Sequence, residues 1–180
     1  EVIRRNLGAE HRWVPSFMFS IGAIYQAQQR FDEAEKLITE ALDICRRVRG
    51  DLHLETLTIT ARLGYLYSDQ ERYQDAERLL VEALEGRRKV LGEAHPETFD
   101  AMGSLGSLYR RQGKLDQAEP LLVECYQTSR EVLGEEYPNT MRYGADLGLL
   151  YYRQGKIDEA GVLWAKLIDM ARRALGDENP

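Results

Sequence analysis

Leu105-Gly106-Ser107-Leu108-Tyr109 is the stretch of sequence that decides the fold, because the chain repeats its pattern at a fixed distance. Leu63-Gly64-Tyr65-Leu66-Tyr67 lies 42 residues earlier, and Leu147-Gly148-Leu149-Leu150-Tyr151 lies 42 residues later. Four sets of residues keep this spacing: Gly22, Gly64, Gly106 and Gly148; Tyr25, Tyr67, Tyr109 and Tyr151; Ala34, Ala76, Ala118 and Ala160; and Gly8, Gly50, Gly92, Gly134 and Gly176. A fixed period of this size is typical of solenoid arrays, in which one structural unit is built several times.

Residues 93–134 show what one unit contains. Pro96 favours a turn into a helix, and apolar side chains at helical spacing predict that helix over about residues 97–112. Gly113 then supplies a left-handed helix stop, and a second helix is expected from about 117 to 133. Each unit is therefore predicted to be a pair of helices.

Polar residues are expected to begin the second helix of each pair. Asp116 is predicted as an N-cap that forms a capping box with Glu119, three residues later. The same box is predicted for Asp32 with Glu35 and for Gln74 with Glu77.

A glycine lies in the middle of each first helix, where it lowers helix stability by ~1 kcal/mol relative to alanine. Its presence in every unit therefore indicates a structural role. We expect Gly106 to be a point of close approach, where the second helix packs tightly against the first. Ala118, a small residue on the second helix, is expected to form the complementary surface. The glycines at the ends of the units, such as Gly134, are expected to stop one unit before the next begins.

These residues resemble the tetratricopeptide repeat, which pairs Leu-Gly-x-x-Tyr on the first helix with a small residue on the second. Here Leu105-Gly106-x-x-Tyr109 is followed by Ala118. The resemblance implies an all-α fold, a right-handed α-solenoid of antiparallel helix pairs. The units are expected at 9–50, 51–92, 93–134 and 135–176, with 1–8 as the end of a preceding repeat helix and 177–180 as the start of a following repeat.

The period of 42 residues indicates a long form of this repeat. It exceeds the usual 34 by about two helical turns, and the long form with a Leu-Gly-x-x-His-Pro-x-Thr junction, as at 91–98, is similar to kinesin light chain repeats. It also resembles arrays in bacterial multidomain signalling proteins and fungal sensor proteins. Kinesin light chains carry two asparagines before the leucine of the first helix, where this chain has Ala61-Arg62, Gly103-Ser104 and Ala145-Asp146. The substitution favours the signalling context over a kinesin cargo adaptor.

The composition excludes some partners. The formal net charge is -6, from 24 basic and 30 acidic residues, which argues against a nucleic-acid partner because such binding needs a basic face. No apolar run approaches the ~20 residues needed to span a bilayer, so no membrane association is expected. Cys45 and Cys125 have no cysteine or histidine nearby at metal-ligand spacing, which predicts reduced thiols and a cytoplasmic location.

Stacked helix pairs form a concave face, which in this family is lined by the first helix of each pair. We expect a peptide there, on Phe19, Arg62, Tyr65, Arg110, Arg111, Arg142, Leu149, Tyr152 and Arg153. Residues on this face differ from unit to unit, as expected of a surface specialised for a partner and equally of an unconstrained solvent face. Arginines outnumber aspartates on it, although the chain is acidic. The predicted ligand is an extended acidic peptide with an aromatic or aliphatic anchor.

Two classes of function follow from these features. The leading prediction is a protein-interaction scaffold that binds a peptide or partner domain on the concave face. The alternative is a regulatory or sensor segment of a larger signalling enzyme that contacts its own domains or self-associates through exposed array ends. No catalytic site, cofactor or metal is expected, because His11, His53 and His95 occupy the same phase of successive units and are too far apart to share an ion.

Overall fold

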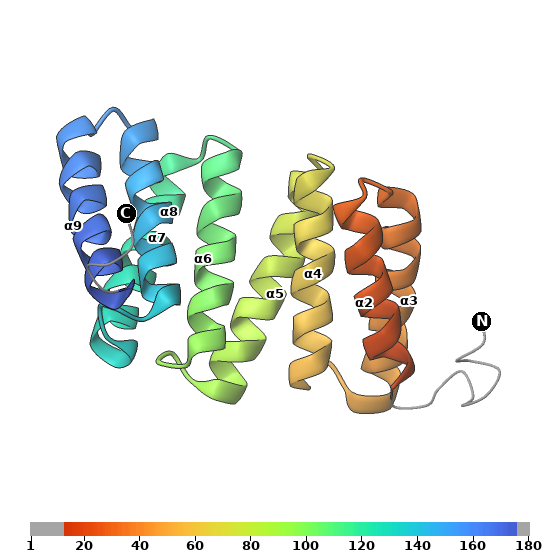
Figure 1. The fold of residues 1–180 in the computed structure, drawn as a ribbon. Helices are drawn as coiled ribbons and strands as arrows, with labels where there is room; N and C mark the ends of the chain where they lie inside the picture. Colours follow the sequence, from red (N-terminus) through yellow and green to blue (C-terminus); the bar gives the residue numbers. More distant parts are fainter. Residues whose placement is uncertain (1–12, 176–180) are drawn as a thin grey trace. The chain divides into compact units, whose positions relative to one another are not determined.

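The computed structural model describes residues 13–175, and eight helices lie within that range (Figure 1). They are α2 (Val14–Ala27), α3 (Phe31–Arg49), α4 (Leu54–Asp69), α5 (Tyr73–Leu91), α6 (Pro96–Arg111), α7 (Leu115–Leu133), α8 (Pro138–Arg153) and α9 (Ile157–Leu175). The described residues form no strand, and the prediction of an all-α array of helix pairs is confirmed. The predictions for Gly8, His11, Gly176 and the segments 1–8 and 177–180 lie outside the described residues.

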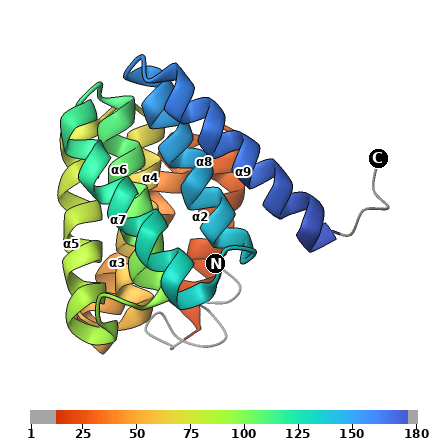
Figure 2. The same cartoon turned by 90° about the vertical axis from the view of Figure 1, so that its left-hand side faces the viewer.

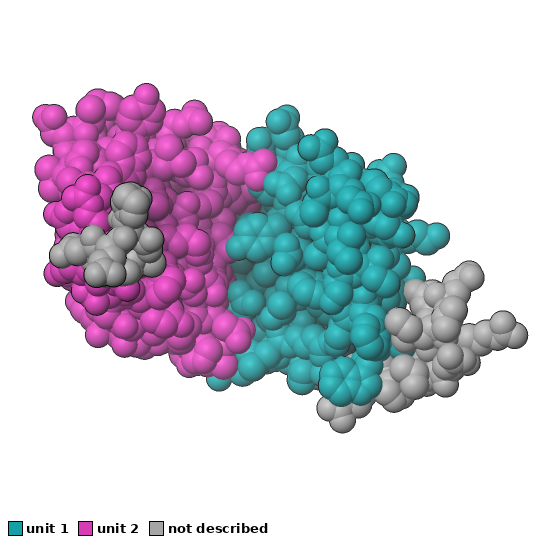
Figure 3. All heavy atoms as spheres, viewed as in Figure 1, with its two compact units in different colours: residues 1–90 teal, residues 91–180 magenta. Residues whose placement is uncertain are grey.

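The chain divides into two compact units, Glu1–Val90 and Leu91–Pro180 (Figure 3). In the first unit α2 packs on α3, and α3 packs on α4. In the second unit α6 packs on α7, α7 on α8, and α8 on α9. Figure 2 shows these four helices from the side on which α9 lies. Each helix pair falls inside one of the expected 42-residue ranges, and the division into four repeats remains a proposal.

The mid-helix glycines lie where the two helices of a pair come closest. A methyl group built on Gly106 would lie 2.7 Å from Cγ of Leu122 and 3.6 Å from the carbonyl oxygen of Ala118. Gly64 has the same surroundings, since its methyl would lie 2.9 Å from Cγ of Leu80. Carbon atoms do not approach so closely in folded proteins, so a side chain at either glycine would force the neighbouring leucine to move. The expected close approach is therefore confirmed, with a buried leucine side chain as the nearest neighbour.

The predicted N-cap at Asp116 is wrong. Helix α7 begins at Leu115, its N-cap is Lys114, and no side chain caps it. Asp116 instead lies in the first turn, where its negative charge favours the helix N-terminus. The predicted caps Asp32 and Gln74 are wrong for the same reason, because α3 begins at Phe31 and α5 at Tyr73.

The glutamates assigned to those capping boxes connect successive helix pairs. Glu35 accepts a hydrogen bond from the hydroxyl of Tyr67 at 3.0 Å and pairs with Arg72 at 2.9 Å. In the second unit Glu119 accepts from the amide of Gln154 and from Lys156, each at 2.7 Å. Glutamate at this position therefore holds the first helix of the following pair.

The turn between the helices of a pair requires a left-handed backbone. Gly113 has φ +76° at this turn, as the sequence predicts. At the same phase of the earlier pairs stand Gln29 and Glu71, both with φ +60°. These side chains adopt a conformation that costs an L-residue roughly 1–2 kcal/mol, so the first unit carries strain that the second avoids.

Candidate functional site

The first helices of the pairs in the first unit, α2 and α4, carry a small apolar depression. It encloses about 280 Å³ and is lined by Ser16, Phe19, Glu55, Thr58 and Ile59. The guanidinium of Arg62 lies over the ring of Phe19, with its carbon 5.3 Å from the ring centroid. Two of the residues predicted to bind peptide are therefore in contact, and Arg62 covers an aromatic face.

The carboxylate of Glu55 at this depression is already neutralised. Its Oε1 accepts from the hydroxyl of Ser16 at 2.5 Å, and its Oε2 pairs with Arg49 at 2.5 Å. The imidazole Nδ1 of His53 accepts from the Glu55 backbone N–H at 3.2 Å and caps α4. Because these contacts satisfy Glu55, it adds little uncompensated negative charge to this face.

In the second unit Asp100 on α6 gathers two side chains from α8. It accepts a hydrogen bond from the hydroxyl of Tyr143 at 2.7 Å and forms a short ion pair with Arg142. The Arg142 guanidinium also lies 4.5 Å from the centroid of the Tyr143 ring. Arg142, which the sequence offered as a ligand for an acidic peptide, is therefore occupied within the chain.

A second cluster lies beside it, around Asp146 on α8. Burial raises the pKa of the Asp146 carboxyl, which Arg142, Arg110 and a hydrogen bond with Ser107 counteract. Burial also lowers the pKa of the Arg110 guanidinium, while Asp146 raises it and Arg153 and Arg111 lower it. The Nε atom of Arg110 is buried and has no hydrogen-bond partner among the described residues. A charged donor is thus held partly out of water with its hydrogen-bonding capacity incompletely used.

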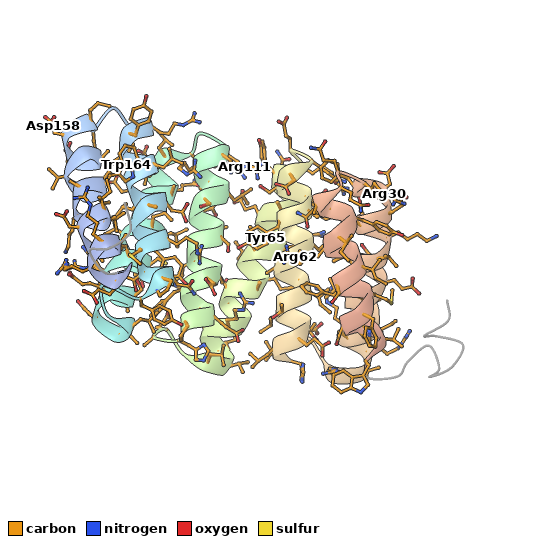
Figure 4. All side chains as sticks on the ribbon, viewed as in Figure 1. Arg30, Arg62, Tyr65, Arg111, Asp158 and Trp164 are labelled. Carbon is orange, nitrogen blue, oxygen red and sulfur yellow. The ribbon has the colours of Figure 1, made fainter. Side chains whose placement is uncertain are left out.

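The remaining predicted residues differ in their exposure. Tyr152 is 53% exposed, and its ring lies 6.1 Å from that of Trp164, an aromatic contact that the sequence did not single out. Arg111 and Arg153 are exposed at the end of their helices, and Leu149 is half-buried. Tyr65 is 38% exposed on α4 of the first unit (Figure 4).

Sequence reasoning also missed a set of cations that keeps the repeat spacing. Each lies over the ring of the periodic tyrosine five residues before it: Arg30 over Tyr25 at 4.2 Å, Arg72 over Tyr67 at 3.9 Å, Lys114 over Tyr109 at 5.5 Å and Lys156 over Tyr151 at 5.3 Å. Their spacing of 42 residues was visible in the sequence. These contacts belong to the scaffold, because every pair contains one.

Both described histidines cap a helix. His95 caps α6 as His53 caps α4, accepting from the Glu97 backbone N–H at 3.2 Å. Within residues 13–175 no group of three histidine, cysteine, aspartate or glutamate side chains is arranged to hold a metal ion. No helix in the same range is long and apolar enough to cross a membrane.

Stacked helix pairs with a constant scaffold and a varied first-helix face define a helical-repeat protein. The sequence profile of the tetratricopeptide repeat matches residues 13–89, 59–131 and 97–172. The chain belongs to the tetratricopeptide repeat family. A search of curated proteins finds no match to this sequence.

Solved structures of similar fold include kinesin-light-chain-like proteins. BtubC (BKLC) from P. vanneervenii is similar with a TM-score of 0.81 and 20% identity, over 92% of this chain and 66% of that one. The TPR-like repeats of a putative kinesin light chain from Podosopora anserina have a TM-score of 0.82 and 21% identity, over 97% of this chain and 82% of that one. The Rap conjugation gene regulator of plasmid pLS20, in complex with the Phr* peptide, has a TM-score of 0.72 and 21% identity, over 89% of this chain and 42% of that one. The chain thus spans about two thirds of BtubC and less than half of the Rap regulator, and the likeness shows the fold.

Proposed function

We propose that this chain is a protein-interaction module and that α6 and α8 of its second unit bind an extended acidic peptide segment. The observation that carries the proposal is the Arg110 Nε atom, buried without a hydrogen-bond partner among the described residues. A carboxylate from a partner that reaches the half-buried guanidinium of Arg110 would supply an acceptor in a partly desolvated site, where charge-assisted hydrogen bonds contribute most.

The charge on this face supports an acidic ligand. Asp100 and Asp146 lie among four arginines, Arg110, Arg111, Arg142 and Arg153. Asp100 satisfies Arg142, and half-buried Asp146 is shared between two arginines. Positive charge therefore exceeds negative charge here, although the whole chain has a net charge of -6.

The neighbouring apolar side chains support an anchor residue on the ligand. Tyr152 and Leu149 lie on α8 close in sequence to Arg153, and the ring of Tyr152 packs beside that of Trp164. Trp164 is labelled in Figure 4. Half-exposed aromatic rings of this kind bury large apolar areas when a partner covers them. The proposed ligand is an acidic segment with one aromatic or aliphatic side chain. The Rap regulator, which is of similar fold, was solved with a peptide.

We place this module in a cytoplasmic signalling protein. The cysteines support that location, since Cys45 and Cys125 are both buried and unpaired. Thiols held in this form suit a reducing compartment. The alternative, a regulatory segment that contacts its own protein, predicts the same face with an internal acidic segment as ligand.

The test is a peptide-binding measurement with a matched pair of double variants. Acidic peptides with one apolar anchor should bind better than scrambled neutral peptides. Arg110→Gln with Arg111→Gln should weaken binding about tenfold or more, because hydrogen bonds to charged groups contribute ~1.5–3 kcal/mol. Arg78→Gln with Lys89→Gln, exposed on α5, removes the same charge and should change affinity little. Equal loss in both double variants, or no preference for acidic peptides, would overturn the proposal.

A further inference from the structure

A second cavity lies on the other helices of the second unit, between α7 and α9 and over α8. It encloses about 470 Å³, within the range of sites that hold small molecules or peptide side chains. Most of its surface is apolar, from Val123, Leu147, Tyr151, Val162 and Leu163. Val162 is 73% exposed, the most exposed of the large apolar side chains described. Nothing in the peptide-binding proposal uses this cavity.

Ion pairing at its edge differs from that at the same position of the first unit. There Arg46 on α3 pairs with Glu82 on α5 at 2.6 Å, so opposite charges connect neighbouring second helices. Two periods later the corresponding residues are Arg130 and Lys166, two cations that cannot pair. Glu135 joins them instead, 2.9 Å from Arg130 Nε and 2.7 Å from Lys166 Nζ. The direct link between the two helices is absent in the second unit, where the cavity opens.

The cavity wall also carries a buried hydroxyl without a partner. Tyr126 on α7 lines the cavity and is 5% exposed, and its hydroxyl has no hydrogen-bond partner among the described residues. Its ring fits because Gly144 faces it: a methyl built there would lie 2.8 Å from Cε2 of Tyr126. The first unit has Leu42 and Thr60 at these two positions. A buried polar atom at the wall of an apolar cavity is a site for a ligand's hydrogen bond.

The charges at the rim decide which ligand fits. Arg130 and Lys166 share the single carboxylate of Glu135, so this end of the cavity carries a net positive charge. At the other end, Asp158, which Figure 4 labels, and Glu159 lie in the first turn of α9. Both are exposed, and neither forms an ion pair among the described residues. Two cations and three carboxylates sum to a net charge of -1, and the negative charge is concentrated at the end formed by Asp158 and Glu159. A cation on the ligand would complement it, in contrast to the arginine-rich face of α6 and α8.

We infer that this cavity binds a basic amphipathic segment of a partner protein, with apolar side chains in the cavity and a lysine or arginine beside Asp158 and Glu159. The apolar side chains cover Val162 and Leu163, and a polar group of the segment bonds the Tyr126 hydroxyl. The module thus has two binding surfaces of opposite charge preference.

The experiment uses a pair of synthetic 18-residue helical peptides and the whole chain. Both peptides carry leucines at positions i and i+4; lysines flank them in one and glutamates in the other. Calorimetry should show the lysine peptide binding at least fivefold more tightly, and methyl NMR should show shifts at Val162 and Leu163. Asp158→Asn with Glu159→Gln should weaken binding about fivefold. Asp32→Asn with Glu33→Gln, the same positions of α3, should leave the affinity unchanged.

Two further variants test the apolar cavity and the hydroxyl. Val162→Ser should weaken binding about fivefold, whereas Ile168→Ser, which removes a similarly exposed side chain of α9 outside the cavity lining, should not. Tyr126→Phe keeps the ring and should also weaken binding.

Several results would overturn the inference: no binding of the lysine peptide, equal affinity for the glutamate peptide, or shifts confined to α6 and Leu149. A dimer that forms without peptide and is lost in Val162→Ser would assign the cavity to a second copy of the chain, which also overturns it. Binding of acidic peptides to Arg110 and Arg111 is measured separately, so failure here leaves that proposal intact.

Discussion

Replacing Gly106 with alanine tests the close packing of α6 on α7. The new methyl would lie 2.7 Å from Cγ and 2.8 Å from Cδ2 of Leu122, which is fully buried. Such overpacking costs ~1–3 kcal/mol. Alanine also gains about 1 kcal/mol over glycine in a helix interior, so the net change ranges from about neutral to about 2 kcal/mol destabilising.

The control is the same substitution where space is available. Gly161 lies inside α9 with no atom within 4 Å of an added methyl. Gly161→Ala should therefore stabilise the chain by about 0.5–1 kcal/mol. Because helix propensity is common to both variants, the difference of ~1–3 kcal/mol between them measures the packing cost alone.

Urea denaturation is the suitable assay, followed by far-ultraviolet circular dichroism and, in a Trp13→Phe background, by the fluorescence of Trp164 in the second unit. In a Leu122→Ala background the clash is removed, so Gly106→Ala should there become stabilising. Equal stabilisation by Gly106→Ala and Gly161→Ala in the parent chain would refute the close-contact explanation of the periodic glycines.

Two other substitutions test the turns and the ion pairs. Glu71→Gly should stabilise the first unit by up to about 1 kcal/mol, and Gly113→Ala should destabilise the second by about 1 kcal/mol, since both positions have left-handed backbones. A Glu71→Gly variant that is less stable than the parent in urea denaturation would contradict the strain assigned to Glu71. Hydrogen bonds from Lys166 and Arg130 lower the pKa of Glu135 to about 2, from 4.5, so its stabilisation is present above about pH 5 and is lost as the pH falls toward 2. Thermal melts of the parent and Glu135→Gln should converge over that interval, and a constant difference down to pH 2 would show that the ion pairs contribute nothing.

The sequence predicted most of the fold because the scaffold depends on short-range rules. Glycine spacing and apolar periodicity identified the helix pairs, and the helix predicted over 97–112 is observed at Pro96–Arg111. The N-cap at Asp116 was wrong because an acidic residue favours a helix N-terminus both as a cap and within the first turn. The sequence could not show that Glu119 accepts hydrogen bonds from Gln154 and Lys156, which lie in the following helix pair.

The candidate site was predicted less completely. Helical phase identified the varied face, but it could not show that Arg142 is occupied by Asp100 and that Arg110 retains a buried unpartnered atom. The second cavity depends on departures from the period, among them Tyr126 with Gly144. Each departure is visible in the sequence, but their joint effect depends on contacts between helices.

The most direct test of the proposed function is the NMR signal of the Arg110 Nε–H group in ¹⁵N-labelled protein during titration with an acidic, apolar-anchored peptide. The account predicts that this signal shifts with the same saturation curve as the binding measured by calorimetry, because the peptide carboxylate supplies its missing acceptor. Arg78 on α5 should show no change. Binding that leaves the Arg110 signal unmoved, or that shifts Arg78 equally, would contradict the assignment of the peptide to α6 and α8.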